Sequence, residues 1–211
     1  MPSSPISRLS PQRRRKLLAD LNYLTMAEIK SFCKRHSIPY AISIGTRGGR
    51  RKTNETDRKG VILQRIRRFL KTGAVPRGTC FSSRVVCFDS PPETITANDR
   101  VYYGQYHKKN SARLAQLKNL TSGKFRDGAI ARILAREFWS KGEAPTFREF
   151  ATAWLKAAQN HKRPNPEWAF LSDRARGAAS RDWKRLRASK AAAVIRFLDS
   201  IPVAEQPPGS I

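Results

Sequence analysis

The sequence is poor in the residues that disulfides, metal sites and acid–base catalysis require. It contains 3 cysteines, 3 histidines and 16 acidic residues in 211. The cysteines form no C-x-x-C pair, so we expect no disulfide framework and a reducing compartment. Cys33, His36, Cys80 and Cys87 could supply zinc ligands only with a widely spaced second pair, and buried thiols are the better interpretation.

Catalytic patterns are also missing. The sequence has no Ser-His-Asp arrangement, no H-E-x-x-H motif and no clustered carboxylates of the kind that a metal-dependent nuclease needs. Gly123-Lys124 is not part of a P-loop, because the upstream glycine and the following Ser or Thr are absent. We therefore predict that the protein is not an enzyme and binds no cofactor or metal.

Long hydrophobic runs are a further absence. No segment approaches the roughly 18 apolar residues of a membrane span, and the first residues lack the apolar core of a signal peptide. We expect no membrane partner. The expected location is the cytoplasm, in association with the nucleoid, for a bacterial protein and the nucleus for a eukaryotic one.

Positive charge is what the sequence has in excess. It contains 42 Lys and Arg against 16 Asp and Glu, for a net charge of +26, while 39% hydrophobic residues argue for a folded chain. Such a surplus is normally neutralised by a polyanion, and nucleic acid is the first candidate. Residues 1–75 hold 18 basic and 4 acidic side chains, a net charge of +14. The first third is therefore the expected docking region.

Hydrophobic spacing predicts a mainly α-helical protein of two small domains. Helices are expected near residues 11–21, 25–37, 57–71, 99–120, 127–139, 146–158, 165–171 and 181–199. Two of them open with capping boxes, Thr25 to Glu28 and Thr146 to Glu149. The β-branched run at 79–88 predicts a short strand or hairpin arm. The predicted organisation is a basic module at 1–78, a connector at 79–98, a helical domain at 99–199 and a disordered tail at 200–211.

Two segments of the first third carry a recognisable order of residues. The first is "LTMAEIKSFCKRHSIP", with Leu24, Thr25, Glu28, Ile29, Lys34, Arg35, Ile38 and Pro39, and the second is "RKGVILQRI", with Lys59, Ile62, Arg65 and Ile66. In order and spacing these residues resemble a SAP-type domain, a helix–extended loop–helix module associated with DNA binding. The family joins its helices by a few residues, whereas Tyr40–Asp57 intervene here. The resemblance implies DNA binding through this module.

The intervening segment, "AISIGTRGGRRKTNETDRKG", is predicted to be a flexible cationic loop. Its glycines would let backbone amides approach a phosphate, and its arginines could contact phosphates or enter a minor groove. Arg58, Arg65 and Arg68 repeat at helical spacing, which predicts one solvent-facing side of the following helix. Lys184, Arg185, Arg187 and Lys190 are expected mostly outside the last helix, while Trp183, Leu186, Val194, Phe197 and Leu198 are expected inside it.

These patterns predict a non-catalytic DNA-binding protein, driven by phosphate contacts and working within a nucleoprotein complex or as a regulatory or architectural factor. The predicted contact residues are Lys34, Arg35, Arg47, Arg50, Arg51, Lys52, Arg58, Lys59, Arg65, Arg68, Lys184, Arg185 and Arg187. Phosphate contacts position a protein without reading sequence, so little base preference is expected. The helical domain would serve as a scaffold or as a surface for protein partners.

Two alternatives remain open at this level. An RNA-binding component of a ribonucleoprotein would have the same composition. A nucleic-acid-processing enzyme with an unrecognised site near Tyr103, His107 or Asp127 is less favoured. Tyr102, Tyr103 and Tyr106, close to Lys108 and Lys109, could stack unpaired bases, but their spacing favours packing within a helix.

Overall fold

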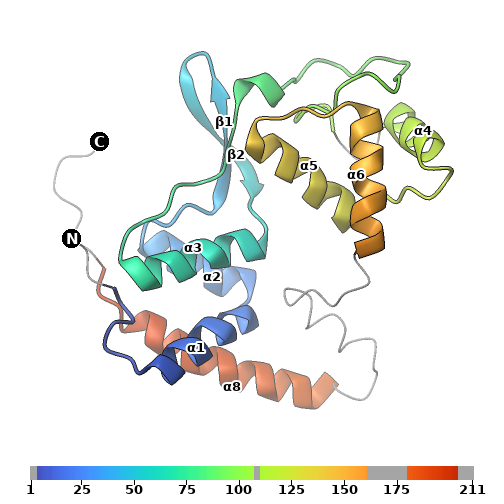
Figure 1. The fold of residues 1–211 in the computed structure, drawn as a ribbon. Helices are drawn as coiled ribbons and strands as arrows, with labels where there is room; N and C mark the ends of the chain where they lie inside the picture. The colour runs from blue at the N-terminus through green and yellow to red at the C-terminus, as the bar shows by residue number, and fades with distance from the viewer. Residues whose placement is uncertain (1–3, 107–109, 161–179, 204–211) are drawn as a thin grey trace. The chain divides into compact units, whose positions relative to one another are not determined.

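A computed structural model describes residues 4–106, 110–160 and 180–203 of the chain, and the side chains of the last range from residue 185 onward (Figure 1). Its elements are α1 (Pro11–Asp20), η1 (Leu21–Tyr23), α2 (Met26–Arg35), β1 (Ala41–Thr46), β2 (Gly49–Thr56), α3 (Lys59–Thr72), β3 (Cys80–Phe81), η2 (Ser83–Val85), α4 (Ser111–Leu120), α5 (Ala129–Lys141), α6 (Phe147–Asn160) and α8 (Ser180–Asp199).

The prediction of a mainly helical fold is wrong. The described residues combine seven α-helices with a three-stranded mixed sheet in the order β2-β1-β3. The segment predicted as a flexible loop is a β-hairpin, in which β1 and β2 are joined by a turn at Arg47 and Gly48. In Figure 1 the two strands run side by side.

Alternation of side chains explains β1. Ile42 and Ile44 are fully buried while their neighbours are partly exposed, which is the two-residue period of a strand with one face on a core. On its other edge, β1 pairs in parallel with β3 through Ser43 opposite Cys80 and Ile44 opposite Phe81. The expected short strand in 79–88 is therefore present, although it has only two residues.

The chain divides into two compact units whose limits differ from the predicted domains. Of the described residues, unit 1 contains 4–41, 55–78 and 180–203, and unit 2 contains 42–54, 79–106 and 110–160. Thus most of the hairpin is grouped with the second half of the chain, and α8 is grouped with the first helices. Neither unit is continuous in sequence.

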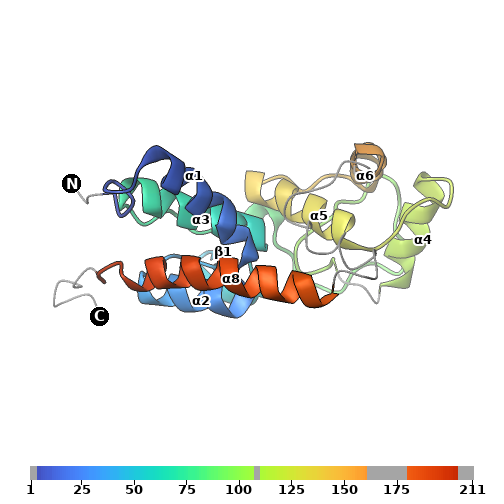
Figure 2. The same cartoon turned by 90° about the horizontal axis from the view of Figure 1, so that it is seen from below.

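Unit 1 is a group of helices around an apolar core. The predicted stripes on α2 and α3 are confirmed, with Ile29, Phe32, Ile62 and Ile66 all nearly inaccessible to solvent. The α8 helix contacts α1 and η1 (Figures 1 and 2). It buries Val194 and Leu198 there, whereas Leu186, which was expected inside, is 47% exposed.

Unit 2 packs α4, α5 and α6 with the inner face of β1 and with β3. Its core includes Phe81, Trp139 and Phe150, and the Trp139 indole donates a hydrogen bond to the Val101 carbonyl at 2.9 Å. The expectation of helix from residue 99 is wrong, because residues 99–106 form turns and isolated bridges and α4 begins only at Ser111. The predicted helix at 165–171 lies outside the described residues, as do His107, Lys108 and Lys109.

None of the described helices is both long enough and apolar enough to cross a bilayer.

Candidate nucleic-acid interface

The hairpin presents four of the predicted contact residues to solvent. Arg47 lies in the turn, and Arg50, Arg51 and Lys52 follow on β2, all exposed. Since side chains alternate along a strand, Arg50 and Lys52 lie on one face and Arg51 on the other. No ion pair is found for these four side chains among the residues that the structure describes.

The second face of the hairpin meets an aromatic ring. The Arg51 guanidinium carbon lies 5.5 Å from the centroid of the Phe88 ring, within the range of a cation–π interaction. Phe88 is 59% exposed. The strand-like run at 79–88 includes Phe88 but gave no sign that its side chain is exposed. The one available indication was its position directly before the polar segment "DSPPET".

Arg65 does not face solvent, and the prediction that it does is wrong. It is 8% exposed, its Nη1 lies 2.7 Å from Oδ2 of buried Asp57, and the same nitrogen donates to the Pro39 carbonyl at 2.8 Å. This pair ties α3 to the segments that enter and leave the hairpin. Arg65 is therefore a structural ion-pair residue of unit 1.

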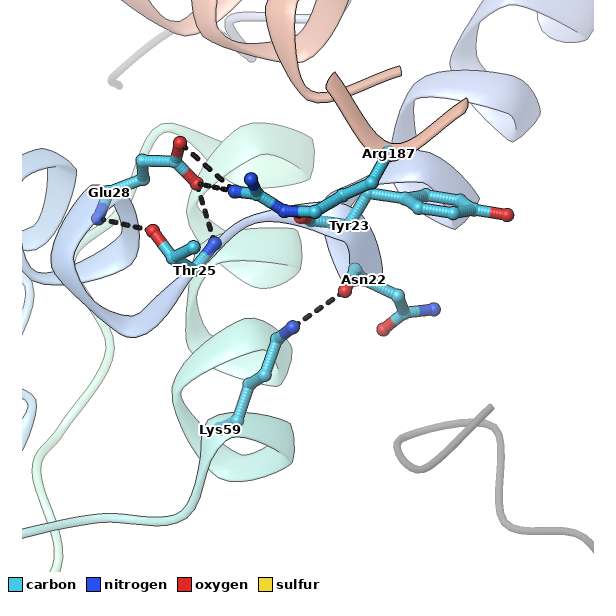
Figure 3. Close-up of polar contacts among 6 residues, drawn as sticks. All are labelled: Asn22, Tyr23, Thr25, Glu28, Lys59 and Arg187. Carbon is cyan, nitrogen blue, oxygen red and sulfur yellow. Dashed lines mark hydrogen bonds and ion pairs between the residues drawn. The ribbon is translucent and has the colours of Figure 1, made fainter. Parts of the chain in front are cut away.

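Arg187 is likewise engaged within unit 1 (Figure 3). Its Nη2 donates to both carboxylate oxygens of Glu28, at 3.2 and 3.1 Å, and its Nε donates to the Tyr23 carbonyl at 3.2 Å. Glu28 also completes the capping box of α2, accepting from the Thr25 amide at 2.6 Å. The guanidinium thus joins α8 to the start of α2.

The same contacts set the ionisation of Glu28. Burial raises the pKa of its carboxyl, but the hydrogen bonds from Thr25 and the positive charge and hydrogen bond of Arg187 outweigh it, so that the net pKa is lowered. Glu28 is therefore an anion at neutral pH, and it neutralises Arg187 rather than leaving that cation for a phosphate.

Two more predicted residues are partly committed to contacts inside unit 1. The Arg35 Nη2 donates to Asp199 Oδ1 at 2.6 Å, and the Lys59 Nζ donates to the Asn22 carbonyl at 2.6 Å (Figure 3). Arg58 precedes α3 as its N-cap residue and is half-buried. Among the unit 1 predictions whose side chains the structure describes, Lys34, Arg68 and Arg185 are exposed. The Lys184 side chain lies outside the described residues.

The structure also shows the surroundings of the other residues that the sequence singled out. Within residues 4–106, 110–160 and 180–203, no group of three His, Cys, Asp or Glu side chains is placed to hold a metal ion. Cys33 is buried, which raises the pKa of its thiol to about 12 despite the Arg65 charge. Tyr102 and Tyr106, whose spacing favoured core packing, are partly buried against the core of unit 2, and Tyr103 belongs to that core, although none of the three lies in a helix. Asp127 forms an ion pair with buried Arg113 at 2.9 Å.

Comparisons with protein-family models, with curated proteins and with solved structures found no significant match to this chain.

Proposed function

We propose that the protein is a non-catalytic DNA-binding protein that contacts the phosphate backbone through its β-hairpin. The observation that carries this proposal is the exposure of Arg47, Arg50, Arg51 and Lys52 in one short element. No acidic residue occurs from residue 41 to residue 54, and Glu55, near the end of β2, is the only acidic residue of the hairpin. A polyanion is the partner that such a surface suits.

The shape of the element suits duplex DNA. A two-stranded β-ribbon fits the major groove, and known β-ribbon proteins use strands in either groove. Cationic side chains on both faces of β2 could then contact phosphates on both sides of a groove. Because such contacts release condensed counterions, affinity should fall steeply as salt rises.

The two ends of the hairpin are held together by contacts among residues that flank it. The Asp57 amide donates to the Tyr40 carbonyl at 2.9 Å, and the side chain of the same Asp57 forms the ion pair with Arg65. Both hold the base of the hairpin. The resemblance of α2 and α3 to a SAP-type domain stays a prediction, under which exposed Lys34 and Arg68 would add contacts.

The test replaces Arg47, Arg50, Arg51 and Lys52 together by alanine. With about 0.9 counterions released per phosphate contact, the slope of log affinity against log salt for a 20-bp duplex should flatten by about three to four units. The measurement is fluorescence anisotropy over a salt series. Equal losses on unrelated duplexes are expected, because phosphate contacts carry no sequence information.

The matched control removes the same charge elsewhere in unit 2. Lys118, Lys124, Lys141 and Arg148 are exposed and lie on or beside α4, α5 and α6. Their replacement by alanine also lowers the net charge by four, but should leave most of the salt slope in place. If both variants lose equally, the charge acts diffusely and the hairpin has no special role. If structured RNA displaces duplex DNA from the wild-type protein, the RNA-binding alternative is the correct one.

A further inference from the structure

Phe88 is the exposed aromatic side chain that stands out in the described part of the chain. The large apolar residues that are strongly exposed there are Val75, Phe88, Leu186 and Val203, and only Phe88 carries a ring. Leaving a phenyl ring 59% exposed forgoes burial of a large apolar side chain, which would otherwise stabilise the fold. An exposed ring next to a cationic hairpin therefore calls for a functional explanation.

The backbone beneath Phe88 is held in place. The Cys87 amide donates to the Tyr103 carbonyl at 2.9 Å, and the Tyr103 amide donates to the Val85 carbonyl at 2.8 Å. The Phe88 and Tyr103 rings meet edge to face, with centroids 6.2 Å apart and planes at 78°. The ring is therefore fixed from below by unit 2 while much of its surface stays open.

Gly104 makes this close approach feasible. A Cβ atom at residue 104 would lie 2.3 Å from the Cys87 carbonyl oxygen and 2.8 Å from Cδ1 of Phe88. The residue also has φ +98°, which favours glycine. The backbone of residue 104 thus packs directly beneath Phe88, and any larger residue would displace the ring.

Arg51 adds the second half of a nucleotide-binding surface. Its guanidinium lies 5.5 Å from the Phe88 ring centroid, and it comes from the hairpin on which the proposed phosphate contacts lie. Proteins that bind unpaired nucleic acid combine a cationic track for the backbone with aromatic rings on which bases stack. Here the two components lie within one unit and in contact with each other.

We propose that Phe88 and Arg51 form a stacking platform for an unpaired base, so that DNA with an unpaired or flipped-out nucleotide is the preferred ligand. This inference rests on the proposed function, since it names the form of DNA that the hairpin holds. The base stacks on the Phe88 ring in the place that the Arg51 guanidinium occupies without a ligand, and Arg51 then contacts the adjoining phosphate. An intact duplex offers no free base face and uses the phosphate contacts alone.

The experiment compares two 20-bp duplexes, one fully paired and one with a single unpaired adenine at its centre. The wild-type protein should bind the bulged duplex more tightly. Phe88→Ala should weaken binding to the bulged duplex by about 10-fold, a typical effect of losing one stacking contact, and leave the paired duplex unchanged. Phe88→Trp should keep the preference, whereas Phe88→Leu, which is apolar but has no π-face, should lose it.

Each other outcome has a definite meaning. Salt-sensitive binding of both duplexes, with no effect of Phe88→Ala on their ratio, overturns the platform and leaves the proposed function standing. Equal weakening on both duplexes also overturns it, because the ring would then act only on the fold. If the wild-type protein binds neither duplex in dilute buffer, the proposed function fails, and the platform fails with it.

Discussion

The basic side chains of the hairpin and those of unit 1 were predicted alike to contact phosphate, but the structure places them in different environments. On the hairpin, Arg47, Arg50 and Lys52 are exposed, and Glu55 is the only acidic residue from 41 to 56. In unit 1, Arg65 and Arg187 are bound to carboxylates. Part of the positive charge therefore stabilises the fold, and a high net charge alone does not locate a binding surface.

The distribution of acidic residues explains the difference. The chain has only 16 of them, so the position of each one decides which cation is neutralised. In unit 1, the cation–acid pairs include Arg35–Asp199, Arg65–Asp57, Arg187–Glu28 and Lys190–Asp20. The hairpin contains no acid before Glu55, and its cations are left to solvent or to an external anion.

The largest expected effect is on stability, from breaking the buried pair. Arg65→Met should lower the free energy of unfolding of unit 1 by about 3–5 kcal/mol, because it leaves the Asp57 carboxylate buried without its cation. The measurement is urea denaturation. Arg50→Ala, on the exposed hairpin, should change the unfolding free energy by less than about 0.5 kcal/mol.

A double variant checks the cause of that loss. Arg65→Met combined with Asp57→Leu removes both charges, and it should recover much of the stability, since a buried ion pair is often replaceable by apolar residues. A loss of under 1 kcal/mol for Arg65→Met alone would mean that Arg65 contributes no more to stability than the exposed hairpin cations do. The contrast between the two groups of cations would then be wrong.

Local rules predicted the helices well. The two capping boxes are present as reciprocal bonds, with the Glu28 amide donating to the Thr25 hydroxyl at 3.3 Å and the Glu149 amide donating to the Thr146 hydroxyl at 3.2 Å. The predicted end of α3 is also confirmed, because Gly73 follows it with φ 71°. These features depend on residues within four positions of each other, which is why sequence reasoning finds them.

Pairing between distant segments could not be predicted in this way. The β2 strand has no buried residue and no apolar side chain, so no apolar alternation marks it in the sequence. The second partner of β1 is β3, which lies some 35 residues further along the chain. The helical period of α3 placed Arg65 with Arg68 on one side, but it could not show that Asp57 would lie against that side. The net charge therefore indicated the candidate site, but the conformation predicted for it, a flexible loop, was wrong because the segment is a β-hairpin.

A smaller effect concerns His36, which is buried in unit 1 in a setting that disfavours its protonated, positively charged form. His36 is 6% exposed and packs against Phe32 and Phe69, with ring centroids 4.5 and 5.2 Å away. Burial lowers its pKa, and the Arg35 charge lowers it further. The unfolded chain therefore takes up the proton first as pH falls below about 6.5, so stability should drop with falling pH, by at most about 1.4 kcal/mol per pH unit.

The check is the urea midpoint between pH 7.5 and pH 5 for the wild type and for His36→Leu. The variant should lose this part of the slope, while slopes from other groups remain in both proteins. A wild-type protein that gains stability as pH falls through this range would show that unit 1 accommodates an imidazolium. Burial of a positive charge would then not require a carboxylate partner.

The smallest expected effect is a difference in stability between variants of two arginines of α8, Arg187 and Arg185. Arg187→Ala should lower the free energy of unfolding by about 1 kcal/mol, since the pair with Glu28 is about one-third exposed and is screened by solvent. Arg185→Ala, two residues earlier and fully exposed, should leave stability unchanged. In the DNA salt titration we expect the opposite order if α8 takes part in binding, because Arg187 is paired with Glu28 whereas no ion pair of Arg185 is found within the described residues. A flatter salt slope for Arg187→Ala than for Arg185→Ala would mean that a DNA phosphate replaces the Glu28 carboxylate as the partner of Arg187. The paired cations of unit 1 would then also contribute to DNA binding.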